Sequence, residues 1–307
     1  MEKFVEKYYR VKKNKPFFKF TYKSNKSLEI LNAIISDVHT GKINEWYDPS
    51  KGINIITYND EIRRKFEQHY LNSFLRLLNL WRYGYYFEKL NLILCGDIID
   101  NDRIFSGQKT KISMPAGKQM WEIANELSDI IGILSVYFNE VNVIGIIGNH
   151  SRSISDSKEE EPIENSFEWT LYKIIELMIS KIGNKKIKVI IPNSKFYSIE
   201  NYGHRIFLSH GDTIRGYTIN YVERKAKELL INLPDGFSLY CLAHRHKADR
   251  VALSPYAEML INGSWIPYDE YSFKLYGTCT QPSQWVFGSS KKRVISSICV
   301  PIDFRDT

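Results

Sequence analysis

The stretch LILCGDIID, residues 92–100, decides the fold, because it is an apolar run that ends in a glycine and two carboxylates. Continuous branched apolar residues are typical of a strand that is buried on both faces. Asp97 and Asp100 then stand where this strand ends and a loop begins. Open α/β sheets place their active sites at that edge, so the stretch predicts both a sheet and a site.

Four further clusters of metal-ligand residues share this setting, and five of the seven histidines fall inside the clusters. They are Asp37-Val38-His39, Gly148-Asn149-His150, Ser209-His210-Gly211 and Ala243-His244-Arg245-His246. Apolar runs precede them, for example residues 143–147 before Gly148. One such cluster alone is equally well explained as a strand end with a turn residue. All five in one chain favour a metal site.

Two divalent ions can be assembled from these side chains. We expect one ion to be held by Asp37, His39, Asp97 and His246. We expect the other to be held by Asp97, Asn149, His210 and His244. Asp97 would bridge, since a carboxylate can offer one oxygen to each ion. Mixed oxygen and imidazole donors suit Mn, Fe, Zn or Ni better than Ca or Mg, and we expect Mn first.

In this order the clusters resemble the calcineurin-like metallophosphoesterase superfamily, whose pattern is Asp-x-His, Gly-Asp-x-x-Asp, Gly-Asn-His-Asp/Glu, a His near Gly, and Gly-His-x-His. The resemblance covers roughly residues 30–250. Ser151 stands where an acidic residue is usual, and Ala243 replaces a glycine. Asn101-Asp102 stands where the phosphoprotein phosphatases have Arg-Gly, which argues against that branch. The stretches 209–216, 261–265 and 282–285 look like phage-encoded members.

The resemblance also implies roles beside the ions. His150 would contact a phosphate oxygen or protonate the leaving oxygen, and Asp100 would orient His150. A guanidinium matches phosphate oxygens, so Arg152 and then Arg215 are candidate substrate-binding residues, ahead of Arg103 and Arg245. Each of these arginines is otherwise explained as a surface ion-pair partner.

The order of the elements predicts one α/β domain over residues 28–307, a metallophosphoesterase-type β-sandwich of two mixed sheets flanked by helices, as the resemblance also implies. We expect helices near 60–82, 116–138 and 163–181, where apolar residues recur at helical spacing. The predicted strands lie near 30–36, 90–95, 141–147, 186–191, 195–200, 205–209, 238–242, 257–262, 272–276 and 294–300. Polar loops are expected at 40–58, 101–117 and 151–162, lining the mouth of the site.

The positive charge belongs to the N-terminal segment 1–27, which has nine basic residues, two acidic residues and seven aromatic residues. Its net +7 equals that of the whole chain, so residues 28–307 are formally neutral. Such a segment can follow phosphates and stack on bases of DNA or RNA. Alternatively, its aromatic residues pack on the domain and its lysines are solvated.

Apolar runs and cysteines indicate the compartment in which the protein is expected. None of the apolar runs approaches the roughly 18 residues of a membrane span, and no secretory signal is evident. Cys95, Cys241, Cys279 and Cys299 form no Cys-x-x-Cys pair, so we expect reduced thiols in a cytoplasm, the host cytoplasm if a phage encodes the chain.

These observations predict a dinuclear phosphoesterase that hydrolyses a phosphodiester, in nucleic acid or a nucleotide, by attack of a metal-bound hydroxide. A phosphomonoesterase acting on phosphoprotein or nucleotide is the first alternative. An inactive binding module with the same fold is an alternative of another class.

Overall fold

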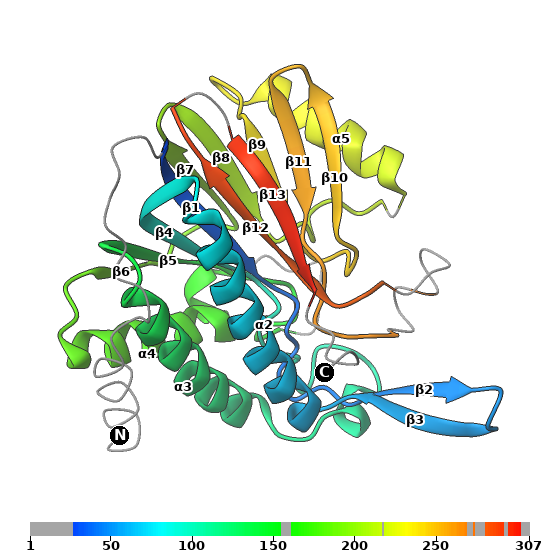
Figure 1. The fold of residues 1–307 in the computed structure, drawn as a ribbon. Coiled ribbons are helices and arrows are strands. Elements are labelled where there is room, and N and C mark those ends of the chain that lie inside the picture. The colour runs from blue at the N-terminus through cyan, green and yellow to red at the C-terminus, as the bar shows by residue number, and fades with distance from the viewer. Residues whose placement is uncertain are drawn as a thin grey trace.

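Two large β-sheets and four α-helices make up most of the computed structural model (Figure 1). The structure describes residues 27–154, 161–216, 218–268, 273, 280–291 and 294–301. Residues 1–26 lie outside this range, so the expectation for the basic N-terminal segment stays a prediction.

The six-stranded first sheet has the order β13-β12-β1-β4-β5-β6. Its four parallel strands are β1 (Ser27–Ile35), β4 (Tyr85–Cys95), β5 (Glu140–Ile146) and β6 (Ile187–Ile190). Strand β12 (Ser283–Ser289) runs antiparallel to β1. Strand β13 (Val294–Pro301) runs antiparallel to β12 and so has the same direction as the four parallel strands. The last described strands therefore pair beside the first one, and the sheet is mixed.

The five-stranded second sheet has the order β10-β11-β9-β8-β7. Its strands are β7 (Phe196–Asn201), β8 (His204–Ser209), β9 (Leu239–Leu242), β10 (Asp249–Ser254) and β11 (Ala257–Ile261). The central strands β8, β9 and β11 are parallel, and the two outer ones are antiparallel to their neighbours. This sheet is mixed as well.

The sheets pack face to face. Ile34, Ile93 and Ile144 of the first sheet share one buried cluster with Leu208 and Cys241 of the second. Because successive side chains of a strand point to opposite faces, neighbours such as Ile35 and Leu94 point away from the second sheet. The predicted sandwich of two mixed sheets is therefore confirmed.

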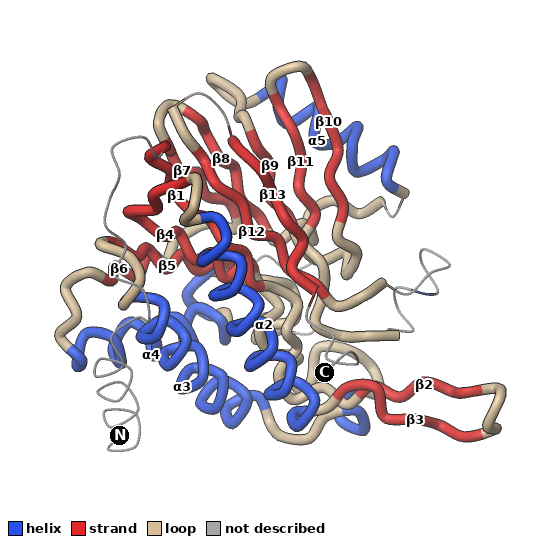
Figure 2. Tube along the Cα trace, viewed as in Figure 1, coloured by secondary structure: helices blue, strands red, loops and turns tan. Residues whose placement is uncertain are grey.

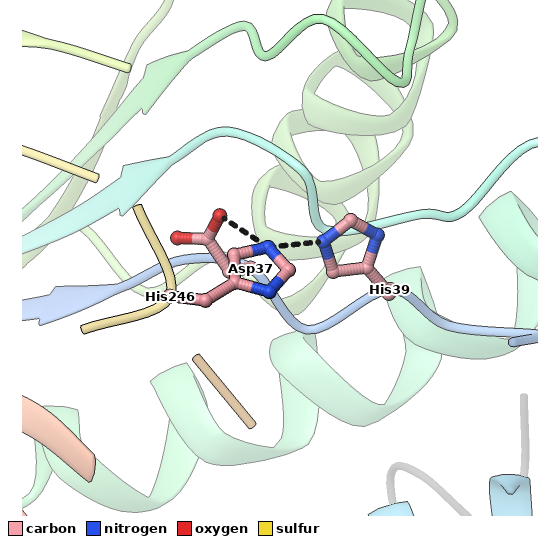
Figure 3. Close-up of side chains that lie close together, drawn as sticks. All are labelled: Asp37, His39 and His246. Carbon is pink, nitrogen blue, oxygen red and sulfur yellow. Dashed lines mark hydrogen bonds and ion pairs between the residues drawn. The ribbon is translucent and has the colours of Figure 1, made fainter. Parts of the chain in front are cut away.

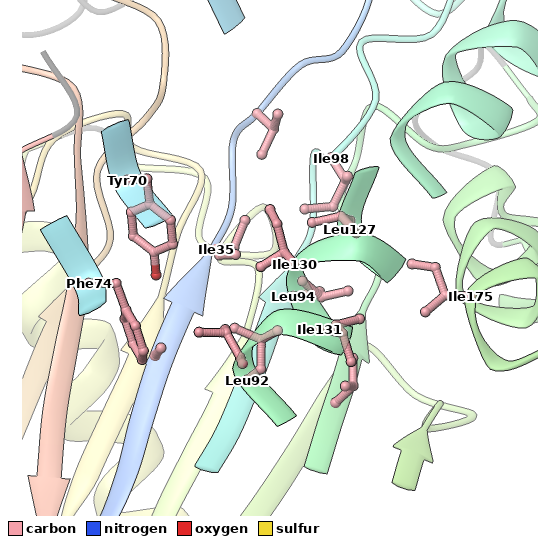
Figure 4. Close-up of a cluster of buried hydrophobic side chains, with 14 of the residues drawn as sticks. Ile35, Tyr70, Phe74, Leu92, Leu94, Ile98, Leu127, Ile130, Ile131 and Ile175 are labelled. Atoms are coloured by element: carbon pink, nitrogen blue, oxygen red, sulfur yellow. The ribbon is translucent and has the colours of Figure 1, made fainter. Parts of the chain in front are cut away.

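Helices cover the outer faces of both sheets, which gives four layers (Figure 2). Helices α2 (Asp60–Trp81), α3 (Ala116–Ser135) and α4 (Phe167–Ile182) pack on the first sheet. Figure 4 shows Leu127 and Ile131 of α3 against Leu92 and Leu94 of β4. Helix α5 (Ile219–Asn232) packs on the second sheet through Val222 and Ala226.

Helix α2 illustrates how the sequence pattern produces this packing. Phe66, Tyr70, Phe74 and Leu78 recur every four residues and are all buried, which puts one apolar stripe toward the core. The side chain of Asn59 caps the first turn by accepting a hydrogen bond from the backbone N–H of Ile62. The three predicted helices are confirmed within a few residues at each end.

The expectation of a loop over residues 40–58 is wrong. Residues 44–48 and 53–58 form an antiparallel hairpin, β2 (Asn44–Asp48) and β3 (Ile53–Tyr58), which projects from the body as an arm (Figure 1). Helix α5 and strands β10 and β12 were not predicted. Apart from Phe273, the strand expected near 272–276 lies outside the described residues.

The two described thiols are part of the packing between the sheets. Cys95 and Cys241 are free and fully buried between the sheets. Cys279 and the side chain of Cys299 lie outside the described part of the chain. None of the helices in the described ranges is long and apolar enough to cross a membrane.

Candidate metal centre

The five polar clusters meet where the two sheets end. Asp37 and His39 follow β1, Asp97 follows β4 and Asn149 follows β5; His210 follows β8, and His244 and His246 follow β9. The three strands of the first sheet are parallel neighbours, as are β8 and β9 in the second. Their carboxyl ends therefore share one edge in each sheet, and the sandwich brings the two edges together.

Backbone hydrogen bonds join the loops beyond the strand ends. The N–H of Asp37 donates to the carbonyl of Gly96, and the N–H of His39 donates to the carbonyl of Asp97, both at 3.0 Å. The N–H of Ala243 donates to the carbonyl of His210 at 2.9 Å. The side chains in these loops are consequently held by fixed backbone before any ligand binds.

Backbone strain is concentrated in these same loops. Five of the nine described non-glycine residues with positive φ are candidate ligands: Asp37, His39, Asp97, His244 and His246, with φ between 48° and 68°. A non-glycine residue in this region costs on the order of 1–3 kcal/mol and persists where the surroundings enforce it. Strain of this kind clusters at functional sites, which supports a site here.

Two glycines permit the close approach of the loops. Gly96 has φ +81°, and a Cβ there would lie 2.7 Å from the Cα of Gly148 and from Nδ1 of His210. A Cβ on Gly148 would collide with the carboxylate and the backbone nitrogen of Asp97. Both positions need glycine because another candidate ligand loop occupies the space of a side chain.

We expect Gly148→Ala to destabilise the protein by about 1–3 kcal/mol, because the added methyl group displaces Asp97 from a packed position. Urea unfolding measures this loss. Gly117→Ala is the matched control, since Gly117 lies in α3 with no atom near the added methyl group, and it should leave stability unchanged or higher. Equal effects of the two substitutions would contradict the close packing at Gly148.

The first group of donors is Asp37, His39 and His246 (Figure 3). One ligand atom from each lies within 4.8 Å of the other two, and all three residues are buried. The Nε2 atoms of His39 and His246 are 3.2 Å apart, and Nε2 of His246 is 3.4 Å from Oδ1 of Asp37. Three donor atoms thus face one point.

The second group is Asp97, His210 and His244. Nε2 of His210 lies 3.0 Å from Oδ2 of Asp97 and 3.2 Å from Oδ1 of Asn149, so Asn149 adds a neutral oxygen. His39 and Asp97 also form a group with His150, which places Asp97 between both sets. All seven sequence-predicted ligand residues are therefore brought together, and His150 lies beside His39 and Asp97.

In each carboxylate, one oxygen accepts a hydrogen bond from a hydroxyl or a backbone N–H, and the other faces a histidine nitrogen. Oδ2 of Asp37 accepts from the Ser36 hydroxyl at 2.6 Å, and Oδ1 of Asp97 accepts from the N–H of His150 at 2.9 Å. Asp37 Oδ1 and Asp97 Oδ2 are buried, and they lie 3.4 Å from Nε2 of His246 and 3.0 Å from Nε2 of His210. A buried carboxylate oxygen is costly without a positive partner, so each of these two atoms needs a protonated histidine or a cation beside it.

The spacing of the donors fits divalent ions as that partner. Atoms that bind one ion at about 2.1 Å lie about 3.0–3.4 Å from one another in octahedral or tetrahedral geometry. The four contacts between Nε2 atoms and their neighbours, from 3.0 to 3.4 Å, fall in this interval. Carboxylate, amide and imidazole donors are also the types that Mn, Fe and Zn accept.

The opposite nitrogens of the histidine rings are fixed by the protein. Nδ1 of His39 lies 2.9 Å from Oδ1 of Asp100, and Nδ1 of His210 lies 2.8 Å from the carbonyl of Cys95. Partners of this kind set the tautomer and orientation of a ligating histidine. Asp100 therefore contacts His39 as well as His150, whose Nδ1 lies 3.0 Å from the Asp100 carbonyl and 3.3 Å from its Oδ1.

The pKa values of the carboxylates and histidines in the cluster are shifted, some upward and some downward. Burial raises the pKa of Asp97, but His210 and His150 outweigh burial and hold the pKa well below the usual range. Burial lowers the pKa of His210, but the adjacent Asp97 raises it to about 10. Burial lowers the pKa of His39 to about 4 and, together with His210, that of His244 to about 3. Perturbed values of this kind are typical of functional sites.

Sequence reasoning missed Glu168, a buried residue near the start of α4. Its carboxylate accepts from the N–H of Ile98 at 2.5 Å and from the N–H of Gly148 at 2.6 Å. It thereby ties the loop of Asp97 to the loop of Asn149. Burial and Asp97 raise its pKa to about 7. A glutamate in the first turn of a helix is ordinary, so the sequence contains no signal for this role.

Lys42 was missed as well, although it lies only three residues after His39. Its Nζ is 3.9 Å from Oδ1 of Asp100, and its side chain is 20% exposed. Asn101 was also missed: its side chain donates to the carbonyls of His150 and Arg152 at 2.7 and 2.9 Å. Both residues secure the loops that carry Asp100 and His150.

The candidate substrate arginines differ in position. Arg152 is half-buried, and its Nε donates to the carbonyl of Asn149 at 2.9 Å, so it lies beside the cluster. Arg215 is exposed, and no hydrogen bond or ion pair joins it to the cluster within the described ranges. Arg245 is buried and donates to the carbonyl of Ile214, and Arg103 pairs with Asp102.

Comparison with known proteins found likeness only among solved structures. Vps29 of Entamoeba histolytica complexed with Zn²⁺ is 12% identical, with 89% of this chain and 100% of that chain covered and a TM-score of 0.38. A predicted phosphoesterase of Streptococcus pneumoniae TIGR4 is 9% identical, with 88% and 98% covered and a TM-score of 0.34. The 5'-nucleotidase of Candida albicans SC5314 is 12% identical, with 92% and 53% covered and a TM-score of 0.39.

No protein-family model matches the sequence, and no curated protein matches it. At the TM-scores above, the likeness to solved structures supports no inference about activity. The functional proposal therefore rests on the geometry of the cluster.

Proposed function

We propose that this protein is a phosphoesterase of the calcineurin-like type that uses two divalent metal ions. The observation that carries the proposal is the pair of buried carboxylate oxygens, Asp37 Oδ1 and Asp97 Oδ2, which face histidine nitrogens at the 3.0–3.4 Å expected of two donors to one ion. Apolar side chains would fill this buried space at a lower free-energy cost than carboxylates and histidines, so packing alone does not explain the cluster.

The residues sort into two ligand sets around Asp97. Asp37, His39 and His246 would hold one ion with Asp97, and Asn149, His210 and His244 would hold the other with Asp97. Asp97 would contribute to both ligand sets, and the N–H of His150 holds its carboxylate in place through Oδ1.

Paired ions, when bound, polarise phosphoryl oxygens and activate water. The protein supplies the remaining parts. His150 is only 16% exposed in its side chain, and Asp100 engages its Nδ1, so Nε2 is the nitrogen that can donate a proton to a leaving oxygen. Burial lowers the pKa of His150, but Asp97 and Asp100 raise it above its usual value, which favours a ring that carries this proton. Arg152 would bind a phosphate oxygen.

A phosphodiester is the proposed substrate class. The support is the chain's charge distribution, since the net +7 lies in residues 1–27 and suits a polyanionic substrate such as DNA or RNA. Mn is the proposed metal on the basis of the donor types. A phosphomonoester substrate and a silent binding module are the alternatives that the experiment must separate.

Hydrolysis of two chromogenic esters tests the proposal. The full chain with Mn²⁺ should hydrolyse bis(4-nitrophenyl) phosphate faster than 4-nitrophenyl phosphate, and a chelator should abolish the reaction. The reverse preference would establish a monoesterase. Failure to hydrolyse either ester with Mn²⁺, Fe²⁺, Zn²⁺ or Ni²⁺ would contradict the enzymatic proposal and favour a binding module.

Metal binding at pH 7 should release at least one proton per chain. His210 is protonated in the metal-free protein because its pKa is about 10, and a ligating imidazole must be neutral. His39 and His244, with pKa values of about 4 and 3, are already neutral and release none. Raising the pH toward 10 should therefore strengthen metal binding, by about tenfold per pH unit for one proton.

Calorimetric titration of metal-free protein in buffers with different ionisation enthalpies measures this release. The observed enthalpy should vary linearly with the buffer's ionisation enthalpy. The slope gives the number of protons released per chain, and its magnitude should be at least one. An enthalpy that is independent of the buffer would show that His210 does not exchange its proton for metal.

A further inference from the structure

A phenyl ring stands at the mouth of the candidate centre. The side chain of Phe105 is 45% exposed, and its ring centroid lies 4.8 Å from that of His150 with an angle of 53° between the ring planes. Single exposed apolar side chains are common on protein surfaces, so exposure alone does not mark a site. The contact with His150 gives this ring a specific position.

The backbone that carries Phe105 is fixed from within. Oε1 of the buried Gln108 accepts from the N–H of Ile104 at 2.8 Å and from the N–H of Phe105 at 3.1 Å. Nε2 of Gln108 donates to the carbonyl of Asp100 at 2.5 Å. That carbonyl is also 3.0 Å from Nδ1 of His150.

Phe105 and His150 are therefore connected through Gln108 and Asp100. The side chain of Ile104 is only 6% exposed and anchors the turn in the protein interior. An apolar ring that is held in a fixed place with one part in solvent is ready to bind a flat apolar group, because little conformational freedom is lost on binding.

We propose that Phe105 forms a stacking subsite for a planar group on the ester oxygen that His150 protonates, a nucleobase or another aryl group. This inference rests on the proposed function. A substrate whose leaving oxygen reaches His150 has its next atoms within reach of the neighbouring phenyl ring. Stacking between a base and an aromatic side chain changes affinity by about 5- to 100-fold.

The test compares two non-hydrolysable inhibitors that differ only in the ring. Benzylphosphonate and ethylphosphonate carry the same phosphonate group, and each is titrated against hydrolysis of bis(4-nitrophenyl) phosphate by the Mn²⁺-loaded full chain. The wild-type protein should bind benzylphosphonate about 5- to 100-fold more tightly. Phe105→Ala should bring this ratio close to one with little change for ethylphosphonate.

Matched variants separate stacking from other effects of Phe105. Phe105→Trp keeps a flat face and should keep the ratio, whereas Phe105→Leu keeps apolar volume and should lose most of it. A second pair of inhibitors, thymidine 5'-phosphate and 2-deoxyribose 5-phosphate, distinguishes a nucleobase from another aryl group. Thermal unfolding of each variant shows whether the fold is intact.

An unchanged ratio in a folded Phe105→Ala protein that still hydrolyses the chromogenic ester would overturn the stacking subsite and leave the phosphoesterase proposal standing. A wild-type protein that hydrolyses no phosphoester with any of the four metals would overturn both. The two failures are thus distinguished by the activity of the wild-type protein.

Discussion

Asp97→Asn should lower the rate of phosphoester hydrolysis by about 1,000-fold or more and weaken the binding of both ions. Asp97 stands between the two ligand sets, and its Oδ2 is buried and lies 3.0 Å from Nε2 of His210. The amide is neutral and nearly the same size, so the substitution removes the charge and preserves the packing. Steady-state rates and metal content after dialysis measure the two effects.

Asp235→Asn is the matched control. Asp235 is exposed and pairs only peripherally with Arg205, at 3.6 Å, so this substitution should change neither rate nor metal content. Two ions retained at full occupancy in the Asp97→Asn protein would refute the bridging role. Loss of one ion alone would show that Asp97 belongs to a single ligand set.

His150→Ala should retain both ions and lose about 100- to 10,000-fold in rate, which is the usual contribution of a general acid. His150 is engaged by Asp100 through Nδ1 and stacks edge-on against His39, with 4.4 Å between the ring centroids. The loss should be larger for a dinucleotide than for bis(4-nitrophenyl) phosphate, because nitrophenolate leaves without needing a proton.

Metal content decides whether His150 acts on the substrate or on an ion. Its ring lies within ligand distance of His39 and Asp97, so the structure also accommodates it as a ligand. A His150→Ala protein that loses an ion would assign it to the ligand set instead. An equal loss of rate for the two leaving groups would argue against proton donation.

The candidate ligands could be predicted from the sequence because each of the five loops that carry them follows a strand directly. Asp97 comes two residues after the end of β4 and His210 one residue after β8. Parallel strands align their carboxyl ends, so a local pattern repeated along the chain specifies one common edge. Sequence reasoning could not show that Asp100 contacts both His39 and His150, because that depends on the path of the loops.

The failures have different physical causes. The arm formed by β2 and β3 contains β-branched and aromatic residues on both sides of the turn at 49–52, which is the pattern of a hairpin. The proline and glycines in this region led to the interpretation of the whole segment as a loop. Strand β12 pairs with β1 across more than 250 residues, as in the pair Ile30 and Ser289, and local periodicity cannot reveal such a partner. Glu168 and Gln108 act through buried contacts to backbone N–H groups that only the folded chain creates.

Titration of the metal-free protein with Mn²⁺, followed by the rate of bis(4-nitrophenyl) phosphate hydrolysis, tests the two-metal centre most directly. The two ligand sets around Asp97 predict that the rate rises with added metal and reaches its plateau at two equivalents per chain. A plateau at one equivalent, or a rate that does not depend on metal, would contradict a dinuclear centre.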